Sequence, residues 1–215
     1  MTGVDERSLL FRRLSAALGR HGGPGETPAP GESTPPPADE AGRIERFTRA
    51  FTSVGGVILS GPPEAALAAL GEALRAEGVT SLFFPPDDTG ARQAAEALVP
   101  FGPFTLIPGE EVRGGNPEST AGFRTADAGI AETGTVVEAS RGEKTLLPGL
   151  LSDVHVALLP AASVVDRMDE VFALYADDPP RNISLISGPS KTADIEQTLT
   201  VGAHGPKKMI VLLLG

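Results

Sequence analysis

The sequence predicts an α/β protein in which a mostly parallel β-sheet is covered by helices on both faces. Two kinds of segment and their alternation lead to this fold class. Short apolar runs rich in Val, Ile and Phe alternate along the chain with segments whose apolar residues recur at helical spacing. Alternation of this kind is typical of parallel sheets, because each connection between parallel strands crosses one face of the sheet.

The regular alternation begins at residue 39 and continues to the end of the sequence. A helix at 39–53 places Ile44, Phe47 and Phe51 on one face, and a helix at 63–76 begins at a proline, which a first helical turn tolerates. The other elements follow in the same way. We predict strands at 56–60, 81–84, 104–107, 135–139, 154–159, 183–186 and 209–214, and helices at 88–98, 164–175 and 192–198.

Two segments of different character precede this domain. Residues 1–20 carry apolar side chains such as Leu10 and Leu14 at helical spacing, so we expect an amphipathic helix that needs a partner surface, on its own domain or on another protein. Residues 21–38 are dominated by Gly and Pro and predict a flexible linker. The expected organisation is therefore helix, linker and one α/β domain at 39–215.

The composition excludes several kinds of site. The chain of 215 residues has no cysteine, so it has no disulfide, no thiolate nucleophile and no cysteine-ligated iron–sulfur cluster of its own. With three histidines, an all-protein zinc site is unfavourable, and we expect no metal. A formal net charge of −10 disfavours nucleic acid and anionic membranes as partners. We see neither a signal peptide nor a membrane span, and we expect a cytoplasmic protein.

The strongest local feature is at 186–196, where a strand, a Gly-Pro turn, a lysine between two hydroxyls and a predicted helix follow one another. Ligands in open α/β sheets bind beyond the carboxyl ends of strands, and a helix N-terminus beside a lysine suits phosphate or carboxylate. The spacing is not that of a Walker A loop. In the alternative, the hydroxyls only cap the helix. The candidate cofactor-binding residues here are Ser187, Gly188, Ser190, Lys191 and Thr192.

Two further turns carry candidate residues. Glu132 lies between glycines, where it serves as base, nucleophile or hydrogen-bond acceptor, or else only satisfies its own turn; Gly134 and Thr135 join it as candidate binding residues. His204 lies among small residues and titrates near neutral pH, although a turn histidine is often simply exposed. We take Glu132 and His204 as candidate catalytic residues. His155 alternates with valines and is expected to be a satisfied sheet residue.

We expect these turns to form one pocket. Glu132, Ser190, Lys191, Thr192 and His204 each lie next to a predicted strand end, so parallel connectivity would bring them to one end of the sheet.

The motifs at 128–135, 147–156, 187–196 and 202–206 together resemble the LUD family, the domain of lactate-utilisation protein C. The resemblance covers roughly residues 40–215. It implies a three-layer α/β/α sheet like that of the sugar-phosphate isomerase and CoA-transferase superfamily. It also implies a three-component system that oxidises L-lactate to pyruvate, in which the partners of this chain carry iron–sulfur clusters.

Three functions remain open at this point. The first is a cluster-free subunit of a lactate-oxidising complex, with a small-anion or cofactor pocket at the strand ends. The second is a stand-alone enzyme, either CoA-transferase-like with Glu132 as nucleophile or cyclo-ligase-like with Lys191 on the phosphates of ATP. The third is a binding module that senses a carboxylate. A G-x-G-x-x-G dinucleotide fingerprint after a strand is missing, so the sequence does not identify a cofactor.

Overall fold

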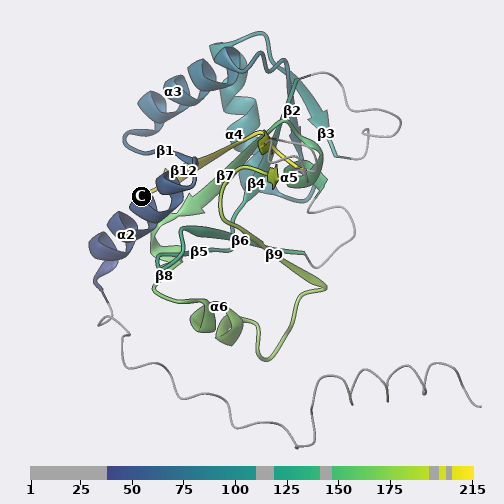
Figure 1. Ribbon diagram of the computed structural model, residues 1–215. Helices are drawn as coiled ribbons and strands as arrows, with labels where there is room; N and C mark the ends of the chain where they lie inside the picture. Colours follow the sequence, from purple (N-terminus) through teal and green to yellow (C-terminus); the bar gives the residue numbers. More distant parts are fainter. Residues whose placement is uncertain (1–37, 110–118, 141–146, 194–198, 202–204) are drawn as a thin grey trace, which may run out of the picture. The chain divides into compact units, whose positions relative to one another are not determined.

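The computed structural model describes residues 38–109, 119–140, 147–193, 199–201 and 205–215. The chain divides into Met1–Pro36 and Pro37–Gly215, and all described residues belong to the second unit (Figure 1). The expected helix at 1–20 and the expected linker, apart from Ala38, lie outside the described residues.

The centre of the second unit is a six-stranded sheet in which every paired strand is parallel to its neighbour. In spatial order its strands are β1 (Val57–Leu59), β12 (Lys208–Leu214), β7 (Val154–Pro160), β4 (Thr120–Thr125), β2 (Ser81–Phe84) and β3 (Thr105–Pro108). Helices flank this sheet, which we call the main sheet (Figure 1). The predicted α/β fold with a mostly parallel sheet is confirmed.

One face of the main sheet is covered by α3 (Pro63–Ala76) and α4 (Thr89–Leu98). Each helix buries a narrow apolar stripe, with Leu70 and Leu74 of α3 and Leu98 of α4 all 0 % exposed. Fully burying a leucine side chain stabilises a fold by ~1.5–3 kcal/mol, so these stripes hold the helices on the sheet. A short 3₁₀ helix, η1 (Val99–Phe101), follows α4 directly.

The opposite face is covered in part by α2 (Glu40–Ser53). Asp39 caps this helix by accepting a hydrogen bond from Gly42 N, 2.9 Å away. Phe47 and Phe51 are completely buried, and their rings stack with centroids 5.7 Å apart. The spacing of these two aromatic residues in the sequence therefore identified the buried face of α2.

A second, smaller sheet also lies on this face (Figure 1). We call it the small sheet; its strands are, in order, β8 (Val164–Val165), β5 (Ala128–Ile130), β6 (Thr135–Ser140) and β9 (Asn182–Ile186). On β6, Val136 packs toward the main sheet, whereas Val137 packs toward α6 (Met168–Leu174). The second face thus holds a helix and a sheet, with α6 beyond that sheet.

The sequence predicted one helix wrongly and another too long. The helix expected to begin at Thr192 is wrong over its described residues, because Lys191–Ala193 forms β10 and pairs antiparallel with β11 (Leu199–Val201). The helix expected at 164–175 is shorter, because Val164–Val165 pairs with β5 before α6 begins. The elements not predicted are β4, β5, β11, α5 (Leu147–Leu151), η1 and η2 (Ala161–Ser163).

Candidate functional site

The loops after β2 and β4 meet at the carboxyl edge of the main sheet, where the direction of the chain connections reverses. From β2 the chain continues through α4 to β3, whereas from β4 it continues through the small sheet to β7 on the other side. Such a switch point is the usual ligand site of an open α/β sheet. An open pocket of ≈ 370 Å³ lies here, which we call the switch-point pocket; it is lined by Asp87, Asp88, Thr89, Gly90, Arg124, Thr125, Ala126 and Asp127.

Asp88 fixes one wall of the switch-point pocket. Its Oδ1 accepts hydrogen bonds from Ala91 N at 2.9 Å and from Thr125 Oγ1 at 2.7 Å, and its Oδ2 accepts one from Thr125 N at 2.8 Å. The carboxylate therefore caps α4 and joins the helix to the end of β4. Gly90 permits this close approach, since a Cβ atom there would lie 2.6 Å from Thr125 Oγ1.

Arg124 provides the positive charge of the pocket. Its side chain is 9 % exposed, and Nη2 donates to the carbonyl oxygen of Ala139 in β6 at 2.6 Å. The carboxylates of Asp88 and Asp127 lie 3.5 and 3.8 Å from Nη1 and Nη2. Among the described residues Nε has no hydrogen-bond partner. A guanidinium has five N–H donors, so this buried group retains capacity for a further acceptor.

The sequence analysis identified none of the residues of the switch-point pocket. Part of the signal was available, because Asp88 follows a correctly predicted strand and begins a correctly predicted helix. The strand that carries Arg124 was not predicted, however, and the fragment Thr120–Thr125 contains a glycine and a charged residue that hide its burial. Without β4, the second wall of the pocket could not be placed.

Several sequence-predicted residues meet at one end of the small sheet. Antiparallel pairing sets Val136 of β6 beside Ile186 of β9, and this brings together the residues that flank them. The hydroxyls of Thr135 and Ser187 are 2.7 Å apart, and that of Thr133 lies 2.6 Å from Thr135 Oγ1. The turns before β6 and after β9 are therefore adjacent through antiparallel pairing in the small sheet, and not through the parallel connectivity that the sequence analysis expected.

The glycines of these turns pack closely against the end of α2. Gly134 has φ of 62°, and a Cβ atom there would lie 2.3 Å from Phe51 N. Gly188 has φ of 102°, and a Cβ atom there would lie 2.9 Å from Cγ2 of Val54. Both positions therefore exclude larger residues because the backbone conformation and the neighbouring helix leave no room.

Lys191 is exposed and donates a hydrogen bond from Nζ to the carbonyl oxygen of Val54, 2.7 Å away. Val54 is the C-cap residue of α2, where a cation is favourable. Ser190 N donates to Pro206 O at 2.9 Å, which joins this segment to the start of β12. Lys191 begins β10, so Thr192 lies in a strand and does not begin a helix as expected.

Glu132 is exposed in the turn between β5 and β6, at the same end of the small sheet as Ser187. Its backbone N–H donates to Asp166 O at 3.1 Å. Hydrogen bonding and charge from Asp169 raise the pKa of Arg167, and the charge of Glu132 adds to this effect. His204 and the side chain of Thr192 lie outside the described residues, so their place beside Glu132 stays a prediction.

His155 is a satisfied sheet residue, as the sequence predicted. Its side chain is 0 % exposed in β7, with Nε2 2.6 Å from Glu138 Oε1 and Nδ1 3.2 Å from Gly122 O. α5 covers the pair, since a Cβ atom on Gly149 would lie 3.1 Å from His155 Cε1. Both ring nitrogens have a partner, and the pair joins the main sheet to the small sheet.

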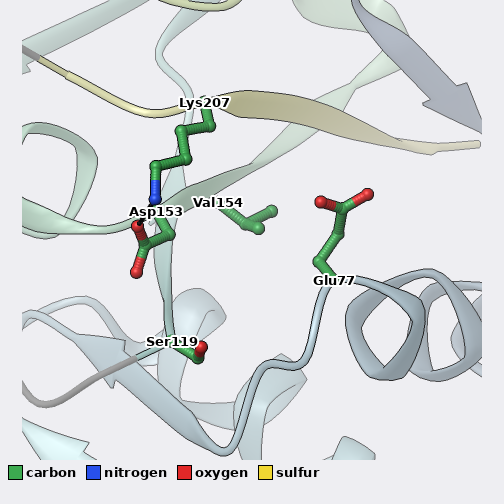
Figure 2. Close-up of a pocket in the computed structure, with 5 residues that line it drawn as sticks. All are labelled: Glu77, Ser119, Asp153, Val154 and Lys207. Atoms are coloured by element: carbon green, nitrogen blue, oxygen red, sulfur yellow. Dashed lines mark ion pairs between the residues drawn. The ribbon is translucent and has the colours of Figure 1, made fainter. Parts of the chain in front are cut away.

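A second pocket, of ≈ 350 Å³, lies at the amino edge of the main sheet (Figure 2). Figure 2 shows Lys207 extended toward Asp153, with Nζ 2.9 Å from Oδ1, and Glu77 on the opposite wall. Burial by itself raises the pKa of Asp153, but hydrogen bonds from Lys207 and from the N–H of Thr120, with the charge of Lys207, lower it below its ordinary value. Charged side chains thus line this pocket in ion pairs.

The described part of the chain contains no cluster of three His, Asp or Glu side chains that could hold a metal ion. None of the helices that the structure describes is long and apolar enough to cross a membrane.

Fold and pocket define an α/β protein built on a parallel sheet with an open pocket at its switch point. The model of the LUD domain family matches residues 45–214, and the chain belongs to this family. A crystal structure of a DUF162 family protein from Deinococcus radiodurans has the same fold, with a TM-score of 0.58 over 83 % of this chain and 100 % of that chain, at 16 % sequence identity.

Curated relatives match about half of the chain or less. An uncharacterised protein of Neisseria meningitidis serogroup B is 39 % identical over 97 residues, 44 % of this chain and 42 % of that protein. Proteins named lactate utilization protein C are 35 % identical in Geobacillus kaustophilus, over 45 % of this chain and 43 % of the relative, and 39 % identical in Halalkalibacterium halodurans, over 41 % of each. The matches therefore span less than half the length of these relatives.

Proposed function

We propose that this chain takes part in lactate utilisation as a cytoplasmic subunit without an iron–sulfur cluster, beside partner subunits that carry such clusters. The observation that supports this is the match of residues 45–214 to the LUD family, together with relatives named lactate utilization protein C. The lack of cysteine agrees with it, because protein iron–sulfur clusters are held by cysteine thiolates. The system as a whole would oxidise L-lactate to pyruvate and pass the electrons to the cluster-bearing subunits.

The proposal includes a small-anion or cofactor site at strand ends. The end of the small sheet is one place for it, since Glu132 is exposed there and the hydroxyls of Thr135 and Ser187 are in contact. Glu132 and His204 remain the proposed catalytic residues of that region, with Lys191 as the proposed cation. The hydrogen bond from Lys191 to Val54 means that an anion would compete with the C-terminus of α2 for the ammonium group.

Growth on L-lactate tests the proposed function. We expect deletion of the gene in its source organism to abolish growth on L-lactate as sole carbon source while growth on pyruvate continues. Pyruvate is the matched control because it enters metabolism after the proposed reaction. A plasmid copy of the full chain should restore growth. Undiminished growth of the deletion strain on L-lactate would refute the proposal.

Purification of the full chain tests the partners. Tagged chain isolated from cells grown on L-lactate should bring with it proteins that contain iron and acid-labile sulfide, whereas the chain produced alone should contain neither. If the tagged chain is recovered without any iron-containing protein, the proposal of cluster-bearing partners is contradicted.

A further inference from the structure

We propose that the switch-point pocket is a binding site for a small monocarboxylate, held between Arg124 and the first turn of α4. This inference rests on the proposed function only where it selects L-lactate as one of the probes. The lining of the switch-point pocket contains none of the site residues that the sequence analysis proposed.

The first turn of α4 supplies one set of donors. Asp88 accepts from Ala91 N, and Arg92 N bonds to Asp88 O, so these two amides are satisfied. The helix provides no acceptor for the N–H groups of Thr89 and Gly90, which both line the pocket. Because Gly90 has no side chain and both residues are exposed, an oxyanion can approach these amides directly.

Arg124 supplies the second set of donors from the opposite wall. Its hydrogen bond to Ala139 O fixes the guanidinium in place, so little side-chain entropy remains to be lost on binding. The side chain is about nine-tenths buried and lines the pocket. Nη2 donates to Ala139 O at 2.6 Å, whereas the ion pairs of Nη1 and Nη2 with Asp88 and Asp127 are longer, at 3.5 and 3.8 Å, so the terminal N–H groups retain capacity for a further acceptor. Carboxylates are the natural partner of such a preorganised, planar group.

The charge of the walls favours a ligand of low negative charge. Asp88 and Asp127 already share the charge of Arg124, and Asp87 adds a third carboxylate to the lining. A phosphate dianion would be repelled by these groups, whereas a monocarboxylate gains the donors at lower electrostatic cost. The pocket of ≈ 370 Å³ also lies near the lower end of ligand sites, which suits a molecule of a few atoms.

Thermal unfolding of the full chain tests this site. At pH 8, where inorganic phosphate is mainly the dianion, acetate and L-lactate should each raise Tm in a saturable manner, and phosphate at equal ionic strength should not. A ligand present at 100 times its Kd stabilises strongly enough for the shift to be measured readily. Equal shifts with all three anions would reveal a general salt effect and would overturn the proposal.

Substitutions at Thr89 measure the contribution of its backbone N–H to binding without disrupting the helix. Thr89 is the first residue of α4, where proline is tolerated, so Thr89→Pro removes one N–H and keeps the helix. Thr89→Ala keeps that N–H and is the matched control. We expect Thr89→Pro to weaken binding of acetate roughly tenfold and Thr89→Ala to leave it nearly unchanged.

Arg124→Gln tests the guanidinium and should weaken carboxylate binding by roughly tenfold to a hundredfold. If this variant does not fold, because Arg124 is buried beside Asp88, the pair at Thr89 still decides the question. Unchanged affinity in a folded Arg124→Gln, or in Thr89→Pro, would refute the site. Loss of growth on L-lactate after deletion, combined with no carboxylate binding, would refute this inference and leave the proposed function intact. Saturable binding combined with normal growth on L-lactate would refute the proposed function and leave this inference intact.

Discussion

Lys191 stabilises the end of α2 in this structure. Its ammonium group donates to the carbonyl oxygen of Val54, one of the carbonyls that a helix C-terminus leaves without an intrahelical partner. The same residue is the proposed cation of a ligand site at the end of the small sheet. The two roles predict different consequences for one substitution.

We expect Lys191→Ala to lower the free energy of unfolding by ~0.3–1 kcal/mol, the usual value of a cation at a helix C-terminus. Urea unfolding followed by circular dichroism measures this well, since the chain has no tryptophan. Arg49→Ala is the control, because Arg49 is an exposed cation of the same helix. Unchanged stability together with weaker binding of an anionic ligand would instead support the ligand role of Lys191.

At the scale of elements, the ion pair of Asp153 and Lys207 joins the segments that lead into β7 and β12. Because the pKa of Asp153 is lowered on folding, the carboxylate stabilises the fold fully above its unfolded pKa of about 3.9. That stabilisation is lost as the pH falls through the lower, folded pKa. The effect therefore belongs to acidic conditions and is complete at neutral pH.

We expect Asp153→Asn to lower the free energy of unfolding by ~0.2–1 kcal/mol at pH 7, since the pair is partly exposed. The difference in the free energy of unfolding between variant and parent should shrink as the pH falls below about 4, because Asp153 then becomes protonated and is neutral like asparagine. Urea titrations at pH 7, 5 and 3 would measure it. A difference that stays constant across this range would contradict the assigned role of the charge.

At the scale of the whole described unit, His155 and Glu138 connect the two sheets through a fully buried contact. Removal of one member leaves the other in an apolar interior without its partner, which is costly. Replacement of both by apolar residues removes that penalty. The pair is therefore expected to behave as a coupled unit.

We expect Glu138→Leu alone to lower the free energy of unfolding by ~1–3 kcal/mol. The double variant Glu138→Leu/His155→Leu should lose less than the sum of the two single variants, with a coupling energy of ~0.5–3 kcal/mol. Glu138→Gln, which keeps a hydrogen-bonding side chain, is the conservative control. Strict additivity in the double-mutant cycle would show that the two side chains act independently.

The sequence by itself determined the features that depend on local periodicity. The buried face of α2, the presence of helices at α3 and α4, the apolar strands β1, β2, β7 and β12 and the satisfied state of His155 all follow from local sequence patterns. The LUD motifs also lie in these local patterns, and the family match bears them out.

The tertiary structure alone decided where the pockets lie and what several polar residues do. β4 does not show the apolar pattern of a buried strand, because it contains Gly122 and Arg124. Arg124 is buried nonetheless, since Asp88 from a loop and Ala139 from the small sheet bind its guanidinium group. Lys191–Ala193 forms a strand because β11 pairs with it, which overrides the helix that its local composition favours. In each case the partner is distant in sequence, and no periodic signal within a segment reports the group that will satisfy it.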